Sequence, residues 1–229
     1  MKKTLIIFFL LAFVASSAYY FYQKKHQKVT TPQPNVVLMH LKQGNTRFAD
    51  GKPRQHNYGK QIKNTKFRQK PEAIVLSCMD SRSIPELAFD QGIGSIFTLR
   101  VAGNVLNQDI MGSMEYGTKV VGAKLIVVLG HTHCGAVEAA CNNIKLGNLT
   151  NLLQEIQPAV ETTKTNFEKN SCSNPKFINA IAKQNVINMT KKIIQDSKII
   201  AKLVKAGKVN IVGGIYNVSS GKVTFISPS

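Results

Sequence analysis

Two runs of consecutive apolar residues place the strongest constraint on how this chain can fold. They are Ala73–Leu76 and Leu125–Leu129, and neither contains a polar side chain. Short continuous runs of this kind are typical of strands buried on both faces, as in a parallel sheet covered by helices. Between them we expect a strand at Ile96–Leu99 and a helix at Gly112–Val121, the alternation of strand-crossover-strand units. The sequence therefore predicts an α/β fold with a central, mostly parallel sheet flanked by helices.

Further elements are predicted on both sides of this centre. Apolar residues at helical spacing over Val36–Asp50, followed by a glycine, predict an amphipathic helix that covers another element. A second helix is expected over Gln184–Lys205. The last strand is expected within Val209–Val218, interrupted by the pair Gly213–Gly214. The 229 residues, 43% of them hydrophobic, suffice for one buried core.

The first 22 residues are set apart by their composition. Two lysines precede the uncharged stretch Leu5–Tyr22, which is long enough for a signal peptide or an uncleaved membrane anchor. Cleavage after the small residues Ser16–Ala18 is the expectation, and the anchor is the alternative. Residues 23–35 are polar and contain prolines, as in a linker, and residues 36–229 form the expected folded domain. We therefore expect an exported protein, either periplasmic or membrane-anchored and facing the periplasm.

The charge of the chain is strongly positive but is carried mostly by lysine. The formal net charge is +18, only five of the thirty basic residues are arginine, and tryptophan is absent. Arginine is the side chain suited to reading guanine and to stacking on bases, so this composition disfavours a nucleic-acid partner. A solvated lysine surface is the favoured interpretation, also for the basic helix that runs on towards Lys208.

Reactive side chains follow both apolar runs directly. Cys78 follows the first in Cys-Met-Asp-Ser-Arg, and His131 and Cys134 follow the second in Gly-His-Thr-His-Cys-Gly. Since the carboxyl ends of parallel strands meet at one edge of the sheet, these three side chains are expected to converge there. Two thiolates and one imidazole form a zinc set with three protein ligands, which leaves a fourth position for water and suggests catalysis. His133 is expected to point away from that set.

The other two cysteines are Cys141 and Cys172. Four unevenly spaced cysteines in a chain of this size do not indicate a disulfide scaffold. A disulfide between Cys141 and Cys172 is compatible with export, but two free thiols are the expectation.

Five motifs together carry a family resemblance. CMDSR begins at Cys78, RVAGN at Arg100 and HTHC at His131, while LKQGNTRFADGK and GGIYNVSSGKV lie towards the two ends of the domain. In this order the motifs resemble those of the β-class carbonic anhydrases, over essentially all of Val36–Ile226. The resemblance implies a β-carbonic-anhydrase-like fold with an N-terminal arm helix. It also implies a homodimer or a dimer of dimers, in which the first helix embraces the partner subunit.

The resemblance further implies a role for each residue of the site. The implied ligands of Zn2+ are Cys78, His131 and Cys134. Asp80 and Arg82 are implied to form the catalytic dyad, in which Asp80 orients water on the metal and Arg82 keeps the carboxylate ionised and turned away from it. Gln69 matches the position of a glutamine that donates a hydrogen bond to the substrate.

These residues predict a carbonic anhydrase, a lyase that reversibly hydrates carbon dioxide to bicarbonate and a proton with hydroxide generated at zinc. Two alternatives stay open. A hydrolase of carbonyl sulfide or carbon disulfide would use the same zinc set. A non-catalytic zinc-binding module would not depend on Asp80.

Overall fold

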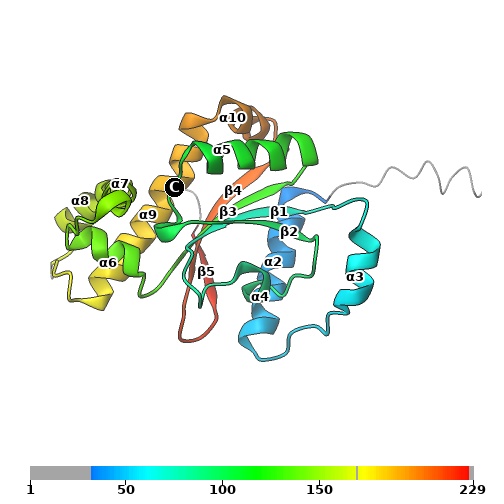
Figure 1. The fold of residues 1–229 in the computed structure, drawn as a ribbon, viewed down its shortest axis with the longest axis horizontal. Helices are drawn as coiled ribbons and strands as arrows, with labels where there is room; N and C mark the ends of the chain where they lie inside the picture. The colour runs from blue at the N-terminus through cyan, green and yellow to red at the C-terminus, as the bar shows by residue number, and fades with distance from the viewer. Residues whose placement is uncertain (1–31, 169, 227–229) are drawn as a thin grey trace, which may run out of the picture. The chain divides into compact units, whose positions relative to one another are not determined.

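The computed structural model describes residues 32–168 and 170–226, and its centre is a five-stranded sheet (Figure 1). The strands lie in the order β2-β1-β3-β4-β5. The first four are parallel, and β5 runs antiparallel to β4. The strands are β1 Ala73–Ser77, β2 Ile96–Arg100, β3 Leu125–His131, β4 Asn210–Tyr216 and β5 Val223–Ile226. The predicted α/β fold with a mostly parallel sheet is confirmed.

The central strands β1 and β3 are buried along their whole length. Their apolar runs allow this, because each strand presents side chains to both faces and both faces are covered. In the parallel register, Leu76 lies beside Val128 and Ser77 beside Leu129. The residues that follow β1 and those that end β3 therefore reach the same edge of the sheet.

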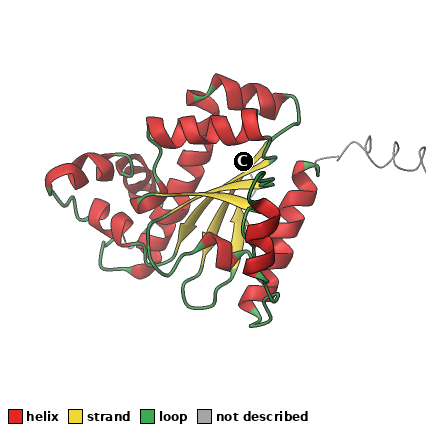
Figure 2. Ribbon diagram, turned by 45° about the vertical axis from the view of Figure 1, so that its right-hand side comes forward, coloured by secondary structure: helices red, strands yellow, loops and turns green. Residues whose placement is uncertain are grey.

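Helices cover both faces of this sheet (Figure 2). A 3₁₀ turn, Ala102–Asn104, follows β2, and a π-helical segment, Tyr116–Val121, follows α5. The α-helices are α2 Pro34–Ala49, α3 Tyr58–Thr65, α4 Pro85–Ala88, α5 Gln108–Glu115, α6 Gly135–Cys141, α7 Gly147–Gln154, α8 Gln157–Thr165, α9 Pro175–Asp196 and α10 Lys198–Lys205.

Each face of the sheet has its own apolar cluster. On one face, α2 packs Leu41 against β1 and β3. On the other face, α5 contributes Met114 and α9 contributes Ile193. Full burial of such a side chain stabilises the fold by about 1.5–3 kcal/mol. A third cluster, formed by α6, α7, α8 and the start of α9, lies beyond the carboxyl edge and includes Cys78 and Cys134.

The helix expected at Val36–Asp50 is present as α2, and it begins two residues earlier, at Pro34. Proline suits the first helical turn because its missing N–H has no partner to lose there. Val37 and Leu41 of α2 pack on the sheet of their own chain. The apolar face of this helix is therefore used within the subunit, and an arm that embraces a partner stays a prediction.

Asn45 joins α2 to three residues in two other parts of the chain. Its Nδ2 donates to the carbonyl oxygens of Ala88, at 2.9 Å, and Gly221, at 2.8 Å. Its Oδ1 accepts from the backbone N–H of Val223 at 2.8 Å. Because the side chain is buried with all these groups bonded, it fixes α2 against α4 and against the start of β5.

The single helix predicted over Gln184–Lys205 is wrong at both its start and its middle. The long helix begins at Pro175 and ends at Asp196, and α10 starts immediately afterwards. Ser197 separates the two because its Oγ accepts from the Ile200 N–H, the bond that starts a new helix. The helix expected at Gly112–Val121 is also displaced, since α5 starts at Gln108 and becomes π-helical at its end.

The predicted interruption of the last strand at Gly213–Gly214 is wrong, because β4 runs through both glycines. A Cβ on Gly213 would lie 2.7 Å from Cγ1 of Val186 on α9. The absence of a side chain thus lets α9 pack closely on β4. The sheet also continues past this strand, since β5 follows and pairs with it.

The expectation of free thiols at Cys141 and Cys172 is wrong. The two residues form a disulfide that joins the end of α6 to the loop before α9. Their Cα atoms are 5.7 Å apart although they are separated by 31 positions in the sequence. Cys78 and Cys134 are free and buried.

The compact unit that contains all these elements is Pro32–Ser229. Within the described part of that unit, no helix has the length and apolar character needed to cross a membrane. The predicted signal peptide or anchor at residues 1–22 and most of the predicted linker at residues 23–35 lie outside the described residues.

Candidate metal centre

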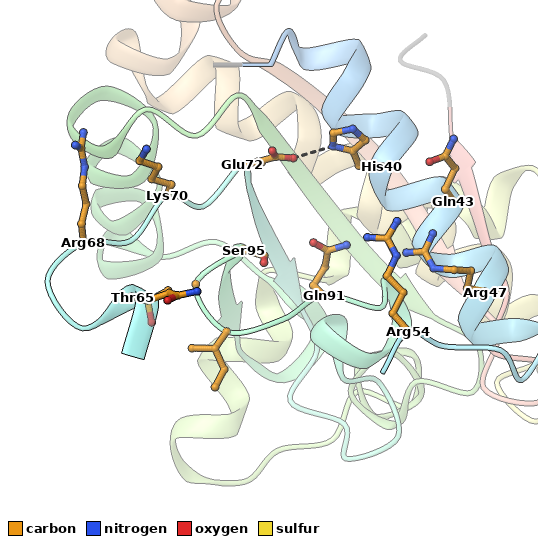
Figure 3. A pocket seen from close by; sticks show the side chains of 13 residues that line it. His40, Gln43, Arg47, Arg54, Thr65, Arg68, Lys70, Glu72, Gln91 and Ser95 are labelled. Atoms are coloured by element: carbon orange, nitrogen blue, oxygen red, sulfur yellow. Dashed lines mark hydrogen bonds and ion pairs between the residues drawn. The ribbon is translucent and has the colours of Figure 1, made fainter. Parts of the chain in front are cut away.

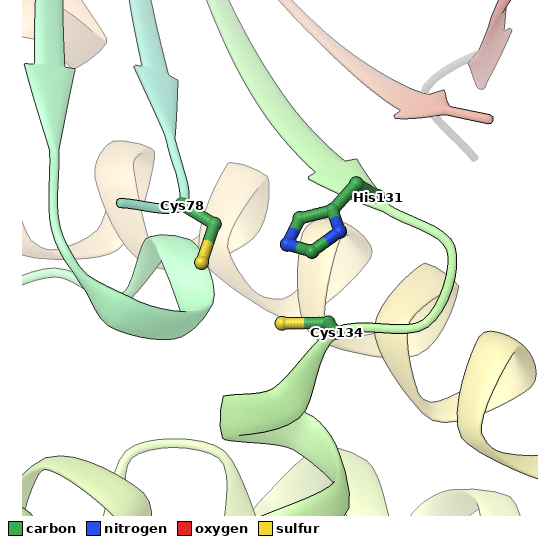
Figure 4. Close-up of side chains that lie close together, drawn as sticks. All are labelled: Cys78, His131 and Cys134. Atoms are coloured by element: carbon green, nitrogen blue, oxygen red, sulfur yellow. The ribbon is translucent and has the colours of Figure 1, made fainter. Parts of the chain in front are cut away.

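Three predicted metal ligands converge at the carboxyl edge of the sheet (Figure 4). Cys78 directly follows β1, His131 is the last residue of β3, and Cys134 precedes the first residue of α6. All three are buried, and their ligand atoms lie within 4.8 Å of one another. The register of the two parallel strands brings these residues together, as the sequence predicts.

The turn between His131 and Cys134 has a backbone that aims both side chains at one point. The Thr132 N–H donates to the carbonyl of Tyr216, which ties the turn to β4. His133 has φ of +55°, the left-handed region that few non-glycine residues adopt. Its N–H donates to Oδ1 of Asn179 on α9 at 3.0 Å, and the residue is exposed. His133 therefore lies outside the buried group of Cys78, His131 and Cys134, on the exposed side of the turn.

The imidazole of His131 presents one nitrogen to the two thiols. Its Nδ1 lies 2.9 Å from the carbonyl oxygen of Thr132, which selects the tautomer with the proton on that nitrogen. Its buried Nε2 has no hydrogen-bond partner within residues 32–168 and 170–226. A buried polar atom normally has a partner, and a metal ion supplies one.

The thiols of Cys78 and Cys134 interact with each other. The hydrogen bond from Cys134 lowers the pKa of Cys78 to about 4, and smaller contributions come from His131 and from the N–H of Gly103. The Gly103 N–H lies 3.3 Å from Cys78 Sγ. The same contact with Cys78, together with burial, raises the pKa of Cys134. A cation between the sulfurs would stabilise both as thiolates, so this donor set fits Zn2+.

Asp80 and Arg82 form a bidentate ion pair beside this set. Arg82 Nε donates to Asp80 Oδ1 at 3.0 Å, and Arg82 Nη2 donates to Asp80 Oδ2 at 2.8 Å. These bonds lower the pKa of Asp80 to about 2. Asp80 Oδ2 lies 3.9 Å from His131 Nε2, so the ionised carboxylate faces the ligand set. Arg82 also donates to the carbonyl of His133, which fixes the dyad to the turn.

Arg100 is a site residue whose role the sequence did not reveal. Its Nε donates to the carbonyl of Cys78 at 3.2 Å and its Nη2 to the carbonyl of Asp80 at 2.6 Å. Arg100 therefore fixes the backbone that carries Cys78, a predicted metal ligand, and Asp80 of the ion pair. Its place in the RVAGN motif is the signal that could have pointed to this role.

Gln69 is not brought to the metal ligands within one chain. It is exposed and precedes β1, whereas Cys78 follows that strand. The five residues of β1 separate the two by roughly 16 Å along the strand. Its implied role at the substrate stays a prediction.

Comparison with known proteins places these residues in a family. The family model described as carbonic anhydrase matches residues 73–223, which contain Cys78, His131, Cys134 and the Asp80–Arg82 pair. A carbonic anhydrase of Mycolicibacterium smegmatis is 34% identical over 185 residues, which cover 80% of this chain and 88% of that protein. A carbonic anhydrase of Pseudomonas aeruginosa is 29% identical over 168 residues, covering 71% of this chain and 76% of that protein.

Solved structures share the fold. A β-carbonic anhydrase of Aspergillus fumigatus matches with a TM-score of 0.69 and 23% identity, over 85% of this chain and 91% of that chain. A tetrameric β-carbonic anhydrase of Sordaria macrospora matches with a TM-score of 0.65 and 18% identity, over 74% of this chain and 90% of that chain. The chain therefore belongs to the β-class carbonic anhydrases, a family of zinc-dependent lyases.

Proposed function

We propose that this enzyme catalyses the reversible hydration of carbon dioxide to bicarbonate and a proton. The observation that carries the proposal is the convergence of two thiols and one imidazole next to a bidentate Asp–Arg pair. Cys78, His131 and Cys134 would hold zinc. Bound there, zinc acts as a Lewis acid that makes water acidic enough to supply a nucleophile near neutral pH.

The residues of the chain would orient that water by accepting a hydrogen bond from it. Asp80 is an acceptor that stays ionised, because the bonds from Arg82 lower its pKa to about 2. With two hydrogen bonds already made to Arg82, the carboxylate is held at one orientation. A water that donates to it would present a lone pair to carbon dioxide. Arg82 also places a positive charge near the bicarbonate that forms.

The decisive experiment measures carbon dioxide hydration and zinc content on the same purified protein. We expect about one zinc per chain and activity that is lost with the metal. Cys134→Ser should abolish both zinc retention and turnover. The double variant Cys141→Ser with Cys172→Ser, which removes two sulfurs outside the ligand set, should keep both. Full zinc occupancy in Cys134→Ser would contradict the ligand assignment, and turnover of carbonyl sulfide in preference to carbon dioxide would contradict the substrate.

We further propose that the active form is a homodimer formed along β2. This strand is at the edge of the sheet, and its residues from Ile96 to Leu99 are only partly buried. Tyr116, which lines a hollow beside β2 with Phe97, is 54% exposed. Unpaired strand edges with apolar neighbours are suited to association. Since Gln69 is remote from Cys78 of its own chain, a role at the substrate would require it to come from a second copy.

We also propose that the protein is exported. The disulfide between Cys141 and Cys172 supports this, because structural disulfides persist in oxidising compartments. The uncharged stretch Leu5–Tyr22 supports it independently.

A further inference from the structure

We propose that a hollow at the amino-terminal edge of the sheet binds a small molecule that carries several oxyanion charges (Figure 3). The hollow is formed by α2, by the segments on both sides of α3 and by the loop that leads into β2. Glu72 and Ser95, which precede β1 and β2, line it, so it lies at the opposite end of the sheet from the metal ligands. Its volume of about 670 Å³ is within the range of small-molecule sites.

The distribution of arginine is the first observation behind this proposal. The chain has thirty basic residues but only five arginines. Two of these, Arg82 and Arg100, lie at the metal centre, and the other three, Arg47, Arg54 and Arg68, all line this one hollow. A general basic coat would be made of lysine, as it is elsewhere in the chain. Arginine instead offers a planar fork that binds the oxygens of phosphate or carboxylate groups in pairs.

A buried carboxylate beneath the hollow holds the side chain of Arg47 and the backbone of Arg54 in place. The side chain of Asp90 is 1% exposed and accepts from Nε of Arg47. It also accepts from the backbone N–H of Arg54 at 3.1 Å and lies 3.0 Å from Nε2 of His56. Arg47 is bound through Nε, and its terminal nitrogens have no partner among the described residues. They are therefore available to a ligand. The Arg47 side chain is thus positioned before a ligand arrives, which lowers the entropic cost of binding to it.

The charges that line the hollow do not cancel. The side-chain nitrogens of Arg54, Arg68 and Lys70 have no hydrogen-bond or ion-pair partner in the part of the chain that the structure describes. Glu72 is the only acidic residue that lines the hollow among the described residues, and its Oε2 lies 2.9 Å from Nδ1 of His40. A hollow with unpaired guanidinium groups favours a negatively charged ligand.

The arrangement of the cations indicates the kind of anion. Figure 3 shows Arg47 and Arg54 extending from one side of the hollow and Arg68 and Lys70 from the other. A ligand with two or more oxyanion groups offers acceptors to the cations on both sides at once. Phosphoryl and carboxylate groups share this chemistry, and a bisphosphorylated or polycarboxylated small molecule would fit it.

Isothermal titration calorimetry of the full-length protein with pyrophosphate tests this proposal. We expect saturable binding of one pyrophosphate per chain. Arg54→Gln and Arg68→Gln should each weaken it by about tenfold or more, because each removes charged hydrogen bonds to the ligand. Neither side chain has a partner in the fold, so both variants should unfold at the temperature of the parent. Lys145→Gln, which removes the same charge from the exposed loop between α6 and α7, should change the affinity by no more than about twofold.

Two further ligands separate the sources of the oxyanion. Inorganic phosphate should bind more weakly than pyrophosphate, because it offers one phosphoryl group to these cations instead of two. Citrate that binds more tightly than pyrophosphate would assign a polycarboxylate, and the reverse order would assign a phosphorylated molecule. The proposal is overturned if no ligand saturates the protein or if Lys145→Gln weakens binding as much as Arg54→Gln. It is also overturned if Arg54→Gln changes only the oligomeric state, since the hollow would then be covered by a second copy.

Discussion

Cys78 is held in place by backbone and side-chain groups that are remote in the sequence. The N–H of Gly103 donates to its Sγ, and the Gly103 carbonyl accepts from Nδ2 of Asn185 on α9 at 2.9 Å. Asn185 is fully buried. Gly103 adopts φ of +66°, and a Cβ there would lie 2.6 Å from Cδ1 of Ile156, so glycine is required on both counts. These contacts orient the ligand from behind, as groups around metal ligands commonly do.

Replacing Arg82 tests whether the dyad is catalytic. In Arg82→Ala, the carboxylate of Asp80 loses both side-chain bonds that fix its orientation, and its pKa returns towards the ordinary value of 3.8. We expect carbon dioxide hydration to fall by at least about 100-fold while the zinc content stays at the parent level. Arg82→Lys, which keeps the charge but not the bidentate geometry, should give an intermediate rate. Activity near that of the parent in Arg82→Ala would mean that the pair is only structural.

Asp90 should make the stability of the protein depend on acidity. Burial acts to raise the pKa of its carboxyl group, but the hydrogen bonds from Arg47, His56 and the Arg54 backbone outweigh burial and keep the pKa below 3.8. Because the pKa is lowered by folding, the stabilisation is complete above 3.8 and is lost as the pH falls through the lower value in the folded protein. Asp90→Asn should lower the free energy of unfolding by about 1.5–3 kcal/mol near neutral pH.

Urea unfolding of the parent and of Asp90→Asn at a series of pH values provides the measurement. The difference between the two proteins should be constant from neutral pH down to about pH 5 and should shrink below about pH 4. A difference that is the same at every pH would show that the carboxylate charge contributes nothing.

At the scale of elements, the sequence predicts best what depends on neighbouring residues. The strands β1 and β3 are recognisable because short continuous apolar runs are typical of strands buried on both faces, and the parallel sheet then places Cys78, His131 and Cys134 together. The break at Ser197 is a local capping bond inside a region of uniform helical spacing, so the periodicity alone does not reveal it. The glycine pair of β4 looks like an interruption until Val186 is placed against Gly213.

Contacts between distant segments could not be predicted in this way. Asn185 and Gly103 are 82 residues apart, and their bond exists only because α9 crosses the sheet. Cys172 lies in a polar loop, and its partner becomes evident only when α6 and the start of α9 are seen side by side.

The disulfide should stabilise the part of the structure that carries a metal ligand. It holds the end of α6, and Cys134 directly precedes the start of that helix. Replacing Cys141 and Cys172 by serine should lower the free energy of unfolding by about 2–4 kcal/mol, mainly because the unfolded chain becomes less constrained. Thermal unfolding with and without a phosphine reductant gives the test. The reductant should bring the parent to the level of the double variant and leave the variant unchanged; equal stability of the two oxidised proteins would contradict the prediction.

At the scale of the whole molecule, the proposed dimer predicts the effect of a charge beside β2. Tyr116→Glu would place a carboxylate at an apolar contact, where its burial is costly. Light scattering should show the parent as a dimer and the variant with a dissociation constant raised by at least roughly tenfold. Leu146→Glu, at a side chain 65% exposed between α6 and α7, is the matched control and should leave the dimer intact. A dimer that tolerates Tyr116→Glu as well as the control would place the interface elsewhere.

Asn45 also bears on how two copies of the sheet could join. Its amide oxygen accepts a hydrogen bond from the Val223 N–H at the start of β5, one of the two edge strands of the sheet. The β5 edge therefore offers fewer free backbone groups to another strand than the β2 edge does. A sheet with one receptive edge can join a second copy about a twofold axis, and both receptive edges are then consumed. Strand addition would thus stop at two five-stranded sheets. With one of its N–H groups already bonded to Asn45, the β5 edge is the less receptive one, which favours a closed pair of subunits over a fibre.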